Sequence, residues 1–318
     1  MSFTKVNAPT LMRDALCNTL IECAERDSRI VALDADLVSS SGLKPFFKKF
    51  PNRSINCGIA EANMMGVAAG LSLTGKIPFA HSFGPFATRR VCDQIFVSQA
   101  YAHLNVRVIG SDPGVTAAYN GGTHMPFEDM AVLRSIPEIT LLEPADPIAL
   151  ANLVTQLSSD EHYGIYYLRV TRKDMPAIYS ADDKFNIGKG NVIRAGGDLT
   201  IFASGIMVAE AMLAADALST EGVDARVVDM FTWKPIDAEL VERCASETGR
   251  FVVAENHNVY GGLGAAIAEA AARTRPVPIE FVGVDDRFGQ VGKQNELQEI
   301  YGLTSSAIIS AAVAVTGR

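Results

Sequence analysis

The sequence predicts an α/β protein with two domains, each a mostly parallel β-sheet covered by helices. Three observations support this fold class. Short apolar runs alternate with Ala-rich helical stretches, the runs are nearly continuous as in strands buried on both faces, and the alternation loosens once, around residues 173–190. At 318 residues the chain is long enough for two domains that each bury a core. We place the first domain at residues 1–185 and the second at residues 190–318.

The predicted elements of the first domain alternate between strands and helices. Gly75 closes one of the helices, and Pro85 suits the first turn of the next. In chain order we predict helix 10–26, strand 29–36, strand 53–58, helix 60–74, strand 77–82, a helix from 84, strand 105–111, a Gly-rich loop at 110–124, a short helix, strand 139–144, helix 147–158 and strand 164–170.

Residues 173–190 read KDMPAIYSADDKFNIGKG and show no clean hydrophobic period, so we predict a segment between domains there. The alternation then resumes and defines the second domain. Its predicted elements are strand 198–205, helix 207–221, strand 224–230, helix 237–248, strand 250–256, helix 263–273, strand 278–284 and two C-terminal helices.

Charge and cysteine content exclude several classes of protein. The net charge of −8 argues against a general binder of nucleic acid or anionic membranes, although a local basic pocket for a phosphate is compatible with it. The five cysteines form no CxxC pair, which indicates reduced thiols. The chain shows no signal-peptide core and no run of about 18 apolar residues. We therefore predict a cytoplasmic protein with no nucleic-acid or membrane partner.

Glu61 is the one acidic side chain in the stretch NCGIAEANMMG at 56–66. One interpretation is structural, because an acid in the first turn of a helix stabilises that helix by about 0.3 to 1 kcal/mol. The other is functional: the stretch offers few polar partners, and an apolar crevice would raise the pKa of the carboxyl and allow proton exchange near neutral pH. Position alone favours the first interpretation, whereas the setting favours a carboxylate that serves a ligand.

The stretch HSFGPFATRRVCDQ, at 81–94, places Phe83 and Phe86 three residues apart beside a turn. Such a pair belongs more often to a core than to a ligand platform. Arg89 follows on the predicted helix.

A candidate binding loop reads GSDPGVTAAYNGGTHMPFED, at 110–129. Its glycines permit close approach of the backbone, and Asp112, Asn120 and His124 share the loop. A lone histidine such as His81 defaults to a structural role, but three polar residues in one loop indicate a ligand site.

Three stretches together resemble the thiamine-diphosphate-dependent transketolases. They are CGIAEANMMGVAAGLSLTG, FGPFATRRVCDQI and GGTHMPFEDMAVLRSIPEITLLEPADP, in that family's order and spacing. The resemblance covers nearly the whole chain. More closely, the chain is similar to the C-terminal half that occurs as a separate subunit in split transketolases, with a pyrimidine-binding domain followed by a transketolase C-terminal domain.

The resemblance implies residues that bind the cofactor, thiamine diphosphate. Glu61 matches an acid that hydrogen-bonds N1′ of the aminopyrimidine, where a protonated carboxyl favours the imino form and so lets the cofactor act as its own base. Phe83 and Phe86 match aromatic residues around the pyrimidine ring, Asp36 resembles an acid near the cofactor, and Arg89 joins this set.

The resemblance also implies residues that bind the sugar. His124 matches a histidine that contacts the donor ketose, and with Glu61 it completes the expected catalytic pair. Arg172 matches an arginine that binds the sugar phosphate, a task for which the guanidinium fork is suited. Arg13 and Ser40 resemble further phosphate contacts, although a helix arginine and a loop serine are also common surface residues.

Two residues depart from the family's pattern. Asp112 stands where ordinary transketolases carry a histidine, and Asn120 stands where they carry an acid that recognises a donor hydroxyl. An amide donates as well as accepts, whereas a carboxylate only accepts, so the hydroxyl pattern that is read can differ. The donor is therefore open: the usual ketose phosphate, or a modified one such as apulose 4-phosphate or a sulfonated sugar.

The chain lacks the GDG motif through which the family binds Mg²⁺ and the cofactor diphosphate. We therefore expect no metal ligand on this chain. A partner subunit should carry the domain that binds the diphosphate and Mg²⁺, with the active site at the interface of a two-plus-two heterotetramer.

The resemblance implies a transferase that moves a two-carbon ketol unit from a ketose phosphate to an aldose phosphate. Alternatives among thiamine enzymes are the beta subunit of a 2-oxo acid dehydrogenase and an enzyme like 1-deoxyxylulose-5-phosphate synthase. A dinucleotide-binding domain is suggested by GGLG at 261–264, which lacks the GxGxxG spacing. In a non-catalytic structural subunit, Glu61 would be a plain helix-start acid.

Overall fold

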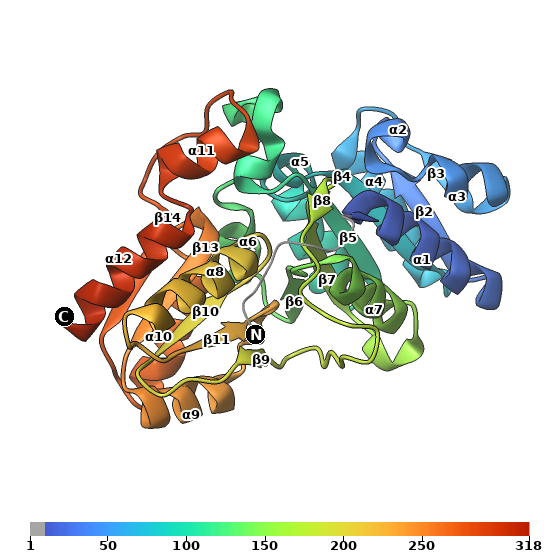
Figure 1. Ribbon diagram of the computed structural model, residues 1–318. Helices are drawn as coiled ribbons and strands as arrows, with labels where there is room; N and C mark the ends of the chain where they lie inside the picture. Colours follow the sequence, from blue (N-terminus) through green and yellow to red (C-terminus); the bar gives the residue numbers. More distant parts are fainter. Residues whose placement is uncertain (1–9, 318) are drawn as a thin grey trace.

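The larger sheet has seven strands, six of which run parallel. A computed structural model describes residues 10–317 (Figure 1). In it these strands are ordered β12-β6-β7-β5-β4-β2-β3. Every residue of β2, β4, β5 and β7 is buried, as expected for parallel strands covered on both faces. The strands are β2 (Ile30–Asp34), β3 (Ser54–Asn56), β4 (Ile77–Phe83), β5 (Val106–Ser111), β6 (Ile139–Leu142), β7 (Ile165–Val170) and β12 (Thr232–Lys234).

Helices cover both faces of this sheet. On one face, α1 and α7 pack against strand residues that include Phe79 and Ile109. On the other, α4 and α6 pack against residues that include Val106 and Val108. The α-helices of this part are α1 (Met12–Arg26), α2 (Val38–Ser41), α3 (Lys44–Lys49), α4 (Glu61–Leu73), α5 (Gly84–Ala87), α6 (Asp129–Arg134) and α7 (Pro147–Leu157).

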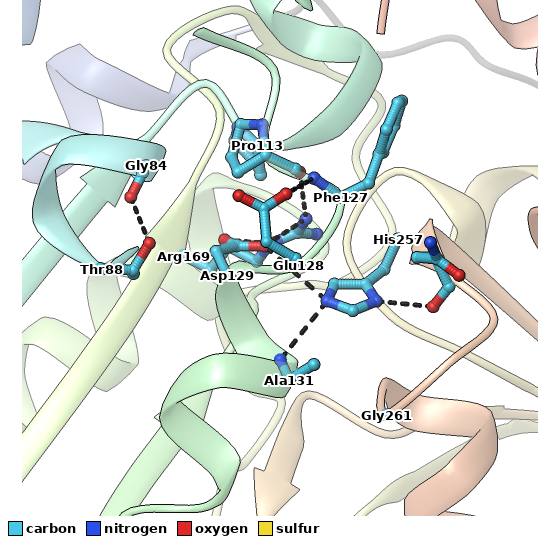
Figure 2. Close-up of polar contacts among 12 residues, drawn as sticks. Gly84, Thr88, Pro113, Phe127, Glu128, Asp129, Ala131, Arg169, His257 and Gly261 are labelled. Atoms are coloured by element: carbon cyan, nitrogen blue, oxygen red, sulfur yellow. Dashed lines mark hydrogen bonds and ion pairs between the residues drawn. The ribbon is translucent and has the colours of Figure 1, made fainter. Parts of the chain in front are cut away.

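The helix predicted from residue 84 is a series of three shorter pieces. α5 ends at Ala87 because Thr88 leaves the helical conformation and its hydroxyl donates to the carbonyl of Gly84 at 2.7 Å (Figure 2). A 3₁₀ turn, Arg89–Val91, and a π-helix, Gln94–Ala100, follow. The 3₁₀ turn sets the directions of the Arg89 and Arg90 side chains.

The second sheet has five strands in the order β14-β13-β10-β11-β9. The central strands run parallel, and β9 pairs antiparallel with β11 at one edge. The strands are β9 (Asn191–Arg194), β10 (Leu199–Ala203), β11 (Ala225–Asp229), β13 (Phe251–Asn258) and β14 (Ile279–Val284), and the helices are α8 (Met207–Thr220), α9 (Ala238–Thr248), α10 (Leu263–Arg273), α11 (Gln294–Tyr301) and α12 (Ser305–Thr316).

Two short pairings join parts of the chain that are far apart in sequence. β1 (Thr10–Leu11) pairs with β8 (Asp174–Met175). β12 follows β11 of the second sheet but pairs antiparallel with β6 of the first. Its Trp233 is fully buried, and the indole Nε1 donates to Ser204 Oγ at 3.0 Å. The two sheets are therefore fixed to each other by a strand as well as by side-chain packing.

Residues 294–316 form the stretch whose length and composition would suit a membrane span in the part of the chain that the structure describes. They are two helices, α11 of 8 residues and α12 of 12 residues, separated by a left-handed Gly302. A single spanning helix needs about 20 residues. Neither helix reaches that length.

Candidate active site

The predicted site residues gather where the parallel strands of the first sheet end. Asp36 lies two residues after β2, Phe83 ends β4, and Asp112 follows β5 directly. Arg172 lies two residues after β7, and Glu61 opens α4 after β3. The carboxyl ends of parallel strands share one edge of a sheet, which is where ligands bind in open α/β folds. The topology thus brings together residues more than 100 positions apart.

Glu61 is the first residue of α4 and only 5% exposed. The carboxylate therefore lies at the positive end of the helix dipole, and no side chain caps that end. The sequence predicted few polar partners for it, and did not identify Arg90, whose Nη1 donates to Glu61 Oε1 at 2.7 Å. The contact depends on the 3₁₀ turn at Arg89–Val91, which the sequence did not reveal.

A row of aromatic rings connects Arg90 with Arg172. The Arg90 guanidinium lies 3.8 Å from the centre of the Phe86 ring. The His124 ring lies 5.1 Å from Phe86 and 5.8 Å from Phe83. The Arg172 guanidinium lies 4.9 Å from the Phe83 ring. We call this continuous row the site strip; it consists of Glu61, Arg90, Phe86, His124, Phe83, Arg172 and Asp112.

Two glycines hold His124 in the strip. Gly121 has a φ of 77°, which few other residues adopt without strain. At Gly122, an added Cβ would overlap the carbonyl oxygen of Gly289, so the loop carrying His124 packs directly on a loop of the second domain. Thr123 Oγ1 lies 2.9 Å from His124 Nδ1.

Arg89 faces away from Glu61. It forms an ion pair with Glu128 and donates to the carbonyl of Thr123 at 3.3 Å, so that it supports the loop that carries His124. Figure 2 shows Glu128, whose Oε2 also accepts from the Phe127 amide at 2.9 Å. A role of Arg89 in binding the cofactor stays a prediction.

Arg172 is held at the opposite end of the strip by an ion pair. Its Nε donates to Asp112 Oδ2 at 2.7 Å, Nη2 donates to the same oxygen, and Nη1 donates to the backbone carbonyl of Ser40 at 3.2 Å. Arg13 packs against Gly42, the residue that follows α2, the helix that carries Ser40. The structure thus brings these predicted phosphate contacts to one place, with Ser40 contributing its carbonyl.

Asp36 and Asn120 lie outside the strip, as Arg89, Arg13 and Ser40 do. Asp36 has a φ of 63° and exchanges hydrogen bonds with Asn56: its amide donates to Oδ1 and its Oδ1 accepts from Nδ2, both at 3.1 Å. Asn120 is exposed on the 3₁₀ segment that precedes the His124 loop.

A buried chain of side chains beneath the strip ties three strand ends together. His81 Nδ1 donates to Asp34 Oδ2 at 3.0 Å, and Nε2 lies 3.0 Å from Ser111 Oγ. All three residues are buried. They link the ends of β2, β4 and β5, which position Phe83 and Asp112.

A second buried network, not predicted from the sequence, joins the two domains. Arg169 on β7 donates to Asp129 at 2.8 Å, to Glu143 at 2.5 Å and to the carbonyl of Asn256 on β13 at 3.0 Å. Burial opposes the charged form of Asp129, but Arg169 outweighs it and holds the pKa of that carboxyl below its usual range. Burial also lowers the pKa of nearby His257 to about 4 (Figure 2).

The chain matches known proteins along nearly its whole length. Residues 9–177 match the family described as transketolase, pyrimidine binding domain, and residues 188–308 match transketolase, C-terminal domain. The 6-deoxy-6-sulfo-D-fructose transketolase subunit SqwH of Clostridium sp. (strain MSTE9) is 51% identical over 96% of this chain and 95% of that protein. An apulose-4-phosphate transketolase subunit of Phocaeicola vulgatus is 36% identical over 95% of this chain and 96% of that protein.

Solved structures and longer relatives agree with these matches. A structure described as split gene transketolase, inactive beta4 tetramer, has a TM-score of 0.89 and 40% identity, and the match covers 98% of this chain and 99% of that one. Transketolase-like protein 2 of Mus musculus is 34% identical over 94% of this chain, which corresponds to 48% of that protein. The chain therefore belongs to the transketolase family and corresponds to its pyrimidine-binding and C-terminal domains.

Proposed function

We propose that this chain is one subunit of a split transketolase, a transferase that moves a two-carbon ketol unit from a ketose to an aldose phosphate. The observation that carries the proposal is the site strip, in which a buried carboxylate, two phenylalanine rings, a histidine and an arginine follow one another along one sheet edge. The names of the similar split subunits support the same reaction class.

The strip fits the pyrimidine end of thiamine diphosphate. Phe83 and Phe86 offer an apolar surface of ring size, and Glu61 offers a buried oxygen at a helix N-terminus. When bound, the cofactor supplies the electron sink that makes carbon–carbon cleavage beside a carbonyl feasible. Arg90 now covers the Phe86 ring and one oxygen of Glu61, so its side chain has to turn outward before a ring can use both groups.

The remaining residues of the strip act on the sugar. We assign His124 to a hydroxyl of the ketose, which its imidazole can hydrogen-bond, and Arg172 to the terminal anionic group. The rings of Phe83 and Phe86 lie against His124 and hold its imidazole in place. We favour a sulfonated or otherwise modified ketose as donor, because the relative that is 51% identical is described as acting on 6-deoxy-6-sulfo-D-fructose.

The other half of the site, in this proposal, comes from a partner subunit. Among residues 10–317, no group of three or more His, Cys, Asp or Glu side chains could hold a metal ion. We assign Mg²⁺ and the cofactor diphosphate to the partner, in a cytoplasmic two-plus-two heterotetramer. A solved split-gene relative that consists of four beta chains is described as inactive, which supports the need for the second chain.

Reconstitution with and without the partner tests this function. The complex with thiamine diphosphate and Mg²⁺ should transfer the ketol unit, and the chain alone should not. Glu61→Gln should lower kcat of the complex by about 10²-fold or more, the usual contribution of a positioned acid, while exposed Glu22→Gln on α1 should leave it unchanged.

Three results would contradict the proposal in different ways. Full activity of Glu61→Gln would support a structural role for that acid. Activity of the isolated chain would remove the need for a partner. Carbon dioxide release from a 2-oxo acid would move the enzyme to the decarboxylating class.

A further inference from the structure

The Arg172 end of the site strip contains its own counter-charge. Asp112 is 1% exposed, and its Oδ2 accepts from both Nε and Nη2 of Arg172. The carboxylate is fixed in place, because the Asp112 amide donates to the carbonyl of Val170 at 3.0 Å and the Arg172 amide donates to Oδ1 at 3.4 Å. Any anion that reaches Arg172 therefore meets Asp112 as well.

Charges of both signs lie at this end. Arg172 pairs with Asp112, Lys173 interacts with both of them, and Arg13, in the helix that follows β1, pairs with Asp14. Asp14 and Arg13 are partly exposed and screened by solvent, whereas Asp112 is dry. Asp112 is thus the carboxylate that most strongly limits how much negative charge a ligand can bring.

The guanidinium still has capacity for a ligand. Of its five N–H donors, three are used by Asp112 and the Ser40 carbonyl, which leaves two for an incoming oxyanion. A sulfonate presents three oxygens and a single charge. A phosphate ester presents similar oxygens but carries close to two charges at pH 7, because its second pKa is about 6. The two remaining donors of Arg172 suit the oxygens of both groups, and the adjacent Asp112 carboxylate favours the group with the lower charge, the sulfonate.

We propose that Asp112 is a specificity-determining residue that makes this site prefer a ketose with a monoanionic terminal group, such as a sulfonate, over one with a dianionic phosphate ester. The inference rests on the proposed function, since it takes Arg172 as the anchor of the substrate's terminal group. It assigns to Asp112 a repulsion of the second charge, in addition to the orientation of Arg172.

The experiment compares two donors that differ only in the terminal group. In the reconstituted complex, kcat/KM is measured for 6-deoxy-6-sulfo-D-fructose and for D-fructose 6-phosphate. The wild type should favour the sulfonate. Asp112→Asn keeps the shape and an oxygen acceptor but removes the charge, and it should lower the sulfonate-to-phosphate ratio at least tenfold, chiefly through a gain for the phosphate. Asp112→His, a second variant, should shift the ratio in the same direction. Exposed Asp14→Asn should change it less than twofold.

A binding measurement separates failure of the inference from failure of the proposed function. Calorimetry of the complex with 3-hydroxypropane-1-sulfonate and 3-hydroxypropyl phosphate should show the same preference and the same shift in the Asp112 variants. A ratio that stays unchanged, or a wild type that prefers the phosphate, would overturn the inference even in an active transketolase. If the binding ratio shifts as expected while no ketose is cleaved, the charge selection stands and the reaction assignment falls.

Discussion

Replacement of Arg169 by methionine should be among the most destabilising single changes in this chain. The guanidinium is fully buried and donates to Asp129, to Glu143 and to the carbonyl of Asn256. Methionine fills much of the space but leaves two carboxylates without a cation in a dry interior. Breaking a buried pair in this way costs about 3 to 5 kcal/mol. A domain is stable by roughly 5 to 15 kcal/mol, so the loss is a large fraction of the total.

Urea unfolding of the isolated chain at pH 7 measures this loss. The chain has one tryptophan, Trp233, which is buried beside the His257 ring at 5.6 Å, so its emission reports separation of the two domains where Arg169 joins them. Far-ultraviolet circular dichroism reports the helices independently. The control is exposed Arg275→Met, which should change the free energy of unfolding by less than about 0.5 kcal/mol.

Two further measurements test the electrostatic origin of the effect. Because Arg169 holds the pKa of Asp129 low, the ion pair stabilises the fold above the unfolded pKa near 4 and loses this contribution as pH falls through that range. The difference between wild type and Arg169→Met should therefore shrink at low pH. Combining Arg169→Met with Asp129→Asn and Glu143→Gln should recover most of the stability, since no charge is left unpaired. A loss below about 1 kcal/mol, or a triple variant no better than the single one, would refute the reasoning.

Two other changes have defined expectations. Burial raises the pKa of Asp229 to about 8; its buried Oδ1 has no hydrogen-bond partner, and Oδ2 accepts from Tyr179. Asp229 should therefore lower the free energy of unfolding by about 1.4 kcal/mol per pH unit as pH rises from about 4 to 8. Urea unfolding at several pH values should show a wild-type slope that is more negative than that of Asp229→Asn by this amount. Gly122→Ala should raise KM for the ketose at least tenfold, because the added Cβ would overlap the Gly289 carbonyl oxygen and displace the loop that carries His124. The control is Gly66→Ala, whose Cβ meets nothing within 4 Å and which should leave KM unchanged. Equal KM values for the two variants would contradict the predicted clash.

The sequence predicted the parallel core well because burial on both faces leaves a simple signal. Runs such as 77–82 and 105–111 are mostly apolar, and the structure confirms β4 and β5 there. β9 and β12 were missed because four and three residues are too few to show a period, and β12 is a strand only through its pairing with a distant sheet. Tertiary contact, which no local pattern encodes, decided these elements.

The residues of the candidate site also fall into two groups: those that local sequence motifs indicate, and those whose roles depend on contacts with distant segments. Motifs indicated Glu61 and His124, whose positions follow from local turns. Arg90 was missed as the partner of Glu61 because the direction of its side chain depends on a 3₁₀ turn where a regular helix was expected. Arg169 was missed because one arginine in the strand IYYLRV predicts an exposed position, and its partners come from α6, the loop after β6 and β13. Ion pairs between distant segments cannot be found by spacing.

Exposed apolar side chains around the site strip indicate where the proposed partner binds. Ile59, in the turn before Glu61, is 79% exposed, and Phe288, in the loop that packs on Gly122, is 97% exposed. Large apolar groups beside a binding site are typical of surfaces that another chain covers. Phe288→Ser and Ile59→Ser should each weaken assembly with the partner about tenfold or more, measured as Kd by sedimentation, without lowering the stability of the isolated chain. Val192→Ser, on the exposed edge strand β9, is the matched control. If assembly is unaffected by both changes near the strip but weakened by the control, the partner covers another face, and the active site does not lie between the two chains at this edge.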